Sequence, residues 1–381
     1  MLSMIQPVIS KGRQRCRVGA SPALFCCLRE TDWIKKIKKK RDFFMKKIIA
    51  IMLAALSLLS LAACGAKEAD YKLGMGVELS TASSKENNAQ VDATVAAVIL
   101  DANGKIVQCR IDVAQNKMDV TGGAVDTAKT FKTKMELGAD YGMAGIVDNN
   151  GDGVMLEWDA QAKAFEEYAV GKTGAEIAAM ETQEANGHLI AVDEALLAAG
   201  CSMQITDFVE AVSKACEDAN AVSFKTADAF TLGVAAVSEA SESTAASAEA
   251  DASVKMYSEF GAAVVAADGK ILAALNDATQ PKITVSVDGA IVEASYKGTK
   301  RELGPDYGMV AYGAAIAEWD AQSAAFSAYT VGKTAAEVRA IETKENDHGY
   351  IVPADETLYA SCTMQITGMM EVIARAADYA R

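Results

Sequence analysis

From residue 91 onward, apolar and polar residues first follow the spacing of strands and then that of helices. Residues 91–100 are mostly apolar, which predicts a buried strand, and Asn103-Gly104 after it predicts a hairpin turn. The next stretch alternates with a period of two, and its apolar face is formed by Val107, Cys109, Ile111 and Val113. Polar Gln108, Arg110 and Asp112 fall on the opposite face, so we predict a half-buried strand with Cys109 in the core.

Further along, apolar residues recur at helical spacing. One predicted face carries Trp158, Ala162, Phe165 and Ala169, and a second carries Trp319, Ser323, Phe326 and Thr330. Capping boxes predict the next helix starts, at Thr173 with Glu176 and at Thr334 with Glu337. We therefore predict an α+β fold in which a strand-rich antiparallel sheet is followed by packed helices.

The same order of motifs occurs twice. The matching stretches are 71–74 with 230–233, 103–106 with 268–271, 136–143 with 302–309, 157–161 with 318–322, and 170–173 with 331–334. This indicates two tandem copies of one domain, residues 71–220 and 224–381, with a short junction near 218–225. The stretch 238–253, rich in Ser, Ala and Glu, falls inside the second copy, so we expect a loop there and not an interdomain linker.

The N-terminal part has the features of a targeting segment. Within residues 45–63, a short basic start precedes an apolar run and then small residues, and Cys64 follows. This order is similar to the lipobox of bacterial lipoproteins, which implies that Cys64 carries lipid and begins the mature chain. A plain membrane anchor is the alternative, but the run is short and lacks a basic stop. Residues 64–70 then form a tether on the extracellular face of the bacterial plasma membrane.

Residues 1–44, upstream of that signal, are rich in Lys and Arg. Two interpretations stay open, a membrane-surface patch and a non-native extension ahead of a true start at Met45; we favour the extension. Residues 1–63 hold 13 basic and 3 acidic residues, so the rest of the chain has 24 basic and 48 acidic residues and a net charge of −24. Such an acidic surface argues against nucleic acid as a partner.

The cysteines and histidines favour neither a disulfide framework nor a metal centre. Four cysteines remain beyond Cys64, at positions 109, 201, 216 and 362, and only Cys201 and Cys362 match between the copies. A disulfide framework would be expected to repeat with the copies. No spacing of cysteines with His188 or His348 fits a zinc site.

A short motif precedes the last predicted helix of each copy. It reads Ala-Gly-Cys-Ser at residues 199–202 and Ala-Ser-Cys-Thr at 360–363. With the strand–turn–strand, the Asp-Tyr-Gly-Met at 140–143 and 306–309, and the Trp-x-x-Gln helix start, it resembles the FMN-binding domains of bacterial lipoproteins. The closest likeness is to the tandem flavin lipoproteins of Gram-positive extracellular electron transfer. The resemblance covers essentially the whole mature chain.

The resemblance implies that a flavin transferase links FMN through its phosphate to Ser202 and Thr363. Chemically, a hydroxyl at an exposed turn can form a phosphoester, and nearby backbone N–H groups can hold the phosphate. The family pattern has Ser-Gly-Ala before the acceptor, however, and an acidic residue closer upstream than those at 193–194 and 355–356. Both copies depart in the same way, so a divergent subfamily that no longer accepts covalent flavin stays open. On that reading Ser202 and Thr363 only cap a strand-to-helix turn.

Other candidates have a structural reading beside the functional one. Trp158 and Trp319 can stack on a flavin ring, but their place on a helix seam is typical of core. Tyr141 and Tyr307 either line a pocket or belong to a turn. Cys201 and Cys362 fit buried small residues better than redox thiols.

Two function classes follow. The first is a lipid-anchored FMN carrier for electron transfer, with a flavin transferase and a redox protein as partners and the membrane contacted through Cys64. The second is a non-catalytic binding or scaffold lipoprotein that kept the fold and lost the flavin. A hydrolase is disfavoured, because Ser202 has no repeated His–Asp partners and no nucleophile elbow.

Overall fold

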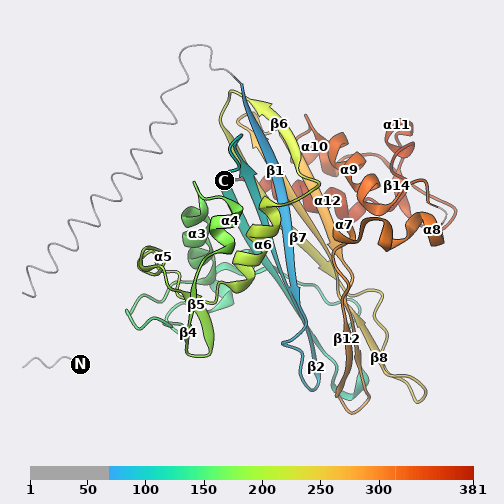
Figure 1. The fold of residues 1–381 in the computed structure, drawn as a ribbon. Coiled ribbons are helices and arrows are strands. Elements are labelled where there is room, and N and C mark those ends of the chain that lie inside the picture. The colour runs from blue at the N-terminus through green and yellow to red at the C-terminus, as the bar shows by residue number, and fades with distance from the viewer. Residues whose placement is uncertain (1–67, 314) are drawn as a thin grey trace, which may run out of the picture. The chain divides into compact units, whose positions relative to one another are not determined.

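The computed structural model of the protein describes residues 68–313 and 315–381. Residues 67–381 form one unit, which contains both predicted copies (Figure 1). The signal sequence and the lipid site Cys64 lie outside the described residues. Among the described helices, none has the length and apolar character needed to cross a membrane.

The first half, residues 68–226, is built on a four-stranded antiparallel sheet in the order β3-β2-β1-β6. Its strands are β1 (Ala69–Ser80), β2 (Asn88–Leu100), β3 (Ile106–Asp119) and β6 (Val222–Thr226). The helices are η1 (Thr121–Gly123), α2 (Lys134–Leu137), η2 (Gly138–Tyr141), α3 (Trp158–Ala169), α4 (Gly174–Ala178), α5 (Glu194–Ala198) and α6 (Thr206–Cys216). A hairpin of β4 (Thr182–Ala185) and β5 (His188–Ala191) lies between α4 and α5 in the sequence.

The second half, residues 227–381, has two three-stranded sheets, β10-β9-β7 and β12-β11-β8. Its strands are β7 (Phe230–Glu239), β8 (Ala252–Lys255), β9 (Tyr257–Ala266), β10 (Ile271–Thr279), β11 (Lys282–Val285), β12 (Ile291–Ser295), β13 (Thr343–Glu345) and β14 (Ile351–Pro353). The helices are α7 (Lys300–Leu303), η3 (Gly304–Tyr307), α8 (Met309–Gly313), α9 (Trp319–Thr330), α10 (Ala335–Arg339), α11 (Glu356–Tyr359) and α12 (Thr367–Asp378).

The halves share one hydrophobic core. Apolar side chains of β1 and β2 gather in a single buried cluster with those of β7, β9 and β10, including Leu73, Val77, Leu232, Val234 and Phe260. The opposite face of each sheet is covered by helices of its own half, α3 and α6 in the first and α9 and α12 in the second. The order of layers is therefore helices, sheet, sheet, helices (Figure 1).

Glycines let the last long helix of each half approach its sheet. A Cβ atom on Gly74 of β1 would lie 2.0 Å from the carbonyl oxygen of Ala215 in α6. A Cβ atom on Gly233 of β7 would lie 1.8 Å from the carbonyl oxygen of Ala376 in α12. No side chain fits at either position, so glycine sets the distance between helix and sheet.

Most local predictions are confirmed. The fold is α+β with antiparallel sheets, Cys109 is buried, both predicted helix faces are buried, and both capping boxes are formed. The stretch between β7 and β8 is a loop, as expected for 238–253.

The stretch near 218–225, where a short junction was predicted, contains the start of strand β6, which pairs with β1 and extends the first sheet. One prediction needs correction. Asp112, expected on the polar face of its strand, is fully buried, and its Oδ1 accepts a hydrogen bond from the N–H of Met135 in α2 (3.1 Å). Burial raises the pKa of Asp112 to about 6.

Candidate functional site

In each half a buried glutamine holds the motif loop that precedes the last helix. Oε1 of Gln161 accepts hydrogen bonds from the N–H groups of Ser202 and Met203, both at 3.0 Å. In the second half, Oε1 of Gln322 accepts from the N–H of Thr363 at 2.8 Å. Sequence reasoning missed this role, although both glutamines stand in the repeated stretches 157–161 and 318–322.

The two candidate hydroxyls differ in exposure. Ser202 is only 1% exposed, and its buried Oγ has no hydrogen-bond partner. Thr363 is half-buried, and its Oγ1 donates to Oε1 of Gln322 at 3.3 Å. The prediction of an exposed hydroxyl is therefore wrong for Ser202.

The burial of Ser202 has a cause in a loop that is distant in sequence. Nδ2 of Asn149 donates to the carbonyl oxygen of Ser202 (3.0 Å), and a Cβ atom on Gly200 would lie 2.5 Å from Cδ1 of Leu156. This loop has 14 residues between Met143 and Trp158, whereas 9 residues separate Met309 from Trp319 in the second half. The longer loop covers Ser202.

The motif cysteines are buried and unreactive. Cys201 and Cys362 are both 0% exposed, and each is a free thiol. Burial raises the pKa of Cys201 to about 12 and that of Cys362 to about 11. The thiolate is the reactive form, so both residues act as small apolar side chains, as their sequence context favoured.

The structure brings the candidate tryptophan and tyrosine of each half together around a lysine. In the first half, Nζ of Lys134 lies 4.9 Å from the ring centre of Tyr141 and 5.5 Å from that of Trp158. In the second half, Nζ of Lys300 lies 4.9 Å from Tyr307 and 5.4 Å from Trp319. These are cation–π distances.

The lysines were missed, although both open a repeated Lys-x-Glu-Leu stretch, residues 134–137 and 300–303. Both tryptophans are core residues, since Trp158 is 2% and Trp319 is 3% exposed. Tyr141 and Tyr307 are half-buried, and each ends a 3-10 helix before a glycine in the left-handed conformation. The prediction that these tyrosines belong to a turn is therefore confirmed for their backbone.

A buried acid joins this group in the second half. The hydroxyl of Tyr257 donates to Oε1 of Glu259 (3.1 Å), and Nζ of Lys300 lies 3.4 Å from the same hydroxyl. Glu259 is 8% exposed and its Oε2 has no partner. Burial raises the pKa of Glu259 to about 7, although the nearby charge of Lys300 acts in the opposite direction.

In the first half, the corresponding acidic residue lies on a helix and not on a strand of the sheet. Thr94 stands nine residues before the Asn-Gly turn, as Glu259 stands nine before Asp268-Gly269. The acid is instead Asp207, at the start of α6, where the second half has Gly368. A Cβ atom on Gly368 would lie 2.4 Å from Oε1 of Glu259, so only glycine leaves room for that carboxylate.

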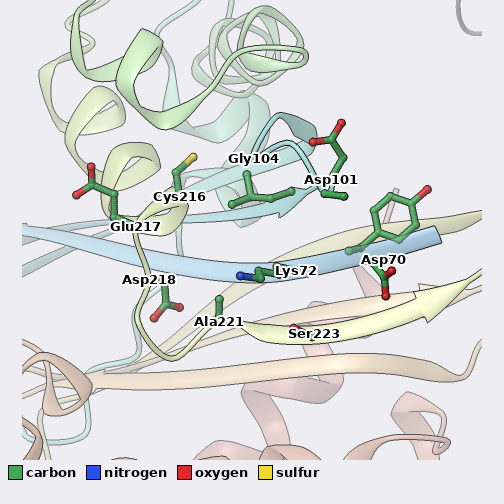
Figure 2. Close-up of a pocket in the computed structure, with 12 residues that line it drawn as sticks. Asp70, Lys72, Asp101, Gly104, Cys216, Glu217, Asp218, Ala221 and Ser223 are labelled. Atoms are coloured by element: carbon green, nitrogen blue, oxygen red, sulfur yellow. The ribbon is translucent and has the colours of Figure 1, made fainter.

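Two surface hollows lie away from these residues. One of about 460 Å³ is bordered by β1, the turn 101–104, the end of α6 and β6 (Figure 2). The carboxylate of Asp218 on its wall is already engaged by Arg301 (3.0 Å) and by the N–H of Met75 (3.0 Å). The second, about 510 Å³, includes Lys132, Glu136 and Arg375, and the last two form an ion pair at 2.8 Å. Neither is lined by a candidate cofactor residue.

Within residues 68–313 and 315–381, no three His, Cys, Asp or Glu side chains gather into a group suited to a metal ion. No protein-family model matches the chain, and no curated protein or solved structure matches it significantly.

Proposed function

We propose that this chain is a membrane-anchored extracellular lipoprotein, a tandem duplication of one FMN-binding-like unit, and that it carries FMN for electron transfer on its second half only. The lipid would be attached to Cys64. A flavin transferase and a redox protein would be its partners.

The duplication is supported by the order of elements and by matched contacts. Both halves contain, in the same order, three long strands, a short helix with a 3-10 turn, a long helix, a short capped helix, a hairpin and a final long helix. The second half adds the short strands β8, β11 and β12 and the short helix α8 to this series. Gln161 and Gln322 make the same contact with the motif loop, and Lys134 and Lys300 contact equivalent rings.

The observation that carries the proposal is the difference between the two hydroxyls. A transferase has to reach the oxygen that it modifies. Thr363 is half-buried and its hydroxyl is oriented by Gln322, whereas Ser202 is 1% exposed under its loop. The phosphoester bond would therefore join the FMN phosphate to Oγ1 of Thr363. The transferase would take the FMN group from flavin adenine dinucleotide, so that the pyrophosphate bond breaks, AMP leaves and the hydroxyl proton is released.

The residues around Thr363 fit FMN in part. When bound, FMN supplies the one- and two-electron chemistry. Lys300 offers a positive charge next to Tyr307 and Trp319. Trp319, however, is 3% exposed in the core, so it does not present a free face for stacking.

The second candidate function is a binding or scaffold lipoprotein without flavin. The sealed Ser202 and the buried thiols favour it, because they show a motif loop maintained for packing. Under this function Thr363 only helps to fix the start of α12.

The test is flavin loading of the full chain, co-expressed with a bacterial flavin transferase and secreted. We expect a flavin absorption band that is lost in Thr363→Ala and retained in Ser202→Ala. No band in the wild type, even after addition of free FMN, would exclude the carrier function and leave the scaffold function.

A further inference from the structure

The loop that covers Ser202 has the composition of a calcium-binding loop. Residues 148–159 read Asp-Asn-Asn-Gly-Asp-Gly-Val-Met-Leu-Glu-Trp-Asp. Oxygen-bearing side chains stand at positions 1, 3, 5 and 12, and glycine stands at position 6, the spacing of a 12-residue calcium loop that leads into a helix. Position 12 is Asp159 where such loops usually have glutamate, and α3 starts one residue earlier.

The backbone of this segment is wound around the first carboxylate. Asp148 accepts hydrogen bonds from the N–H groups of Gly151 (2.8 Å), Asp152 (3.2 Å) and Gly153 (2.9 Å). Gly153, at the position of the sharp turn, has a φ of 81°. Asp148, Asp152 and Asp159 do not gather into a group suited to a metal ion in this structure, so binding has to draw the last two toward the carboxylate of Asp148.

One atom of the loop lacks the partner that it needs. Oδ1 of Asn150 is inaccessible to solvent and accepts no hydrogen bond, while Nδ2 of the same amide donates to Oδ2 of Asp152 at 3.0 Å. A buried amide oxygen without a partner is unfavourable, and a bound cation removes that cost. This oxygen belongs to position 3, which supplies a ligand in calcium loops.

The negative charge of residues 148–159 also favours a bound cation. Residues 148–159 contain four acidic residues and no Lys or Arg. Among the ion pairs of the described residues, none involves Asp148, Asp152, Glu157 or Asp159.

We propose that residues 148–159, the calcium loop, bind one Ca²⁺ ion. The ligands would be Asp148, Asn150, Asp152, the main-chain carbonyl of Val154, and Asp159. Oδ1 of Asp159 now accepts from the N–H of Ala160 (2.8 Å), so this side chain turns toward the loop when the ion binds. Amide and carbonyl oxygens in a flexible loop suit Ca²⁺ better than Mg²⁺, which demands strict octahedral geometry.

Binding would have a consequence for the motif loop. The calcium loop holds the carbonyl of Ser202 through Asn149, and Gly200 packs on Leu156. The ion therefore fixes the cover over Ser202. The proposal does not depend on flavin, and it applies to the first half only, because the second half has the shorter connection.

The test is a calorimetric Ca²⁺ titration of the full chain after treatment with a chelator. We expect one ion per chain with a Kd on the order of 10⁻⁴ to 10⁻³ M, the range of extracellular calcium modules. Asp152→Asn and Asp159→Asn should each weaken binding at least tenfold. Asp320→Asn, the same helix position in the half without the loop, is the matched control and should bind as the wild type does.

Terbium locates the ion. Tb³⁺ bound in the loop should give luminescence sensitised by Trp158, which is lost in Trp158→Phe and kept in Trp319→Phe. Unchanged thermal unfolding of Asp159→Asn in chelator would show that the variant is folded. The proposal is overturned by absence of saturable binding at 10 mM Ca²⁺, by equal effects of Asp159→Asn and Asp320→Asn, or by equal affinity for Mg²⁺.

Discussion

The two halves use the same set of contacts around their motif loops, yet one loop is sealed and the other is partly open. Gln161 and Gln322 each accept a hydrogen bond from the N–H of the motif hydroxyl residue, and Cys201 and Cys362 are buried in both. The difference comes from the segment before the long helix, which is five residues longer in the first half, with 14 residues against 9. Access to a hydroxyl is thus decided by a loop about fifty residues away in the sequence.

A second difference concerns the acid near the lysine. The second half has Glu259 on strand β9 opposite Gly368, and the first half has Asp207 on helix α6. Each half retains a carboxylate in this region, but on opposite layers. The pairing of a large side chain with glycine shows that the two positions adapt to each other.

The largest effect is expected at the contact that joins the halves. Asp218 of the first half and Arg301 of the second pair at 3.0 Å, and both side chains are 7% exposed. Asp218→Ala leaves the charge of Arg301 buried and the N–H of Met75 unpaired, so it should cost about 3–5 kcal/mol of unfolding free energy in urea titrations. Asp70→Ala, which breaks an exposed pair with Lys225, is the control and should cost less than about 1 kcal/mol. Equal effects would contradict the burial of the Asp218–Arg301 pair between the halves.

The next effect is a pH dependence that comes from Glu259 of the second half. The pKa of Glu259 is raised from 4.5 to about 7, so the folded state holds this proton more tightly than the unfolded state. The resulting stability is present below about pH 4.5 and is lost as pH rises through 7, on the order of 3 kcal/mol. Glu259→Gln should therefore be more stable than the wild type at pH 8, with a smaller decline between pH 5 and pH 8 in urea unfolding. Parallel profiles for the two proteins would show that Glu259 is not held protonated.

A smaller effect should be the same in both halves. Gly74→Ala and Gly233→Ala each place a methyl group against a carbonyl oxygen of the last helix, at 2.0 and 1.8 Å. Each should cost about 2–3 kcal/mol in thermal or urea unfolding, because helix and sheet must separate. One cooperative transition is expected for both variants, since the halves share a core. Two transitions would contradict that coupling.

The smallest expected effect is at the capping boxes. Thr173→Ala and Thr334→Ala remove the acceptors for the N–H groups of Glu176 and Glu337. Each should lower the free energy of unfolding by about 1 kcal/mol. A clear difference between them would show that the two short helices are not equivalent.

The parts of the fold that depend on local pattern were predictable. The strand 88–100, its hairpin turn and the faces of the long helices follow from residues within a few positions of one another. For the candidate site, the sequence identified several of the residues that take part but not that Ser202 is buried. Ser202 carries no signal of burial in its own neighbourhood, because Asn149 and Leu156 cover it from another segment.

The lysines and the shared core were missed for a similar reason. Lys134 reads as an ordinary charged residue until the fold places it over Tyr141 and Trp158. The faces of β1 and β7 that meet in one core are apolar in both halves, and apolar composition does not tell which surface will cover them.

The most direct test of the account is the intact mass of the secreted protein after co-expression with a flavin transferase. Sealed Ser202 and accessible Thr363 predict a mass increase of one FMN, found on the peptide that contains Thr363. A gain of two FMN would contradict the sealing of Ser202, and no gain would contradict flavin carriage altogether.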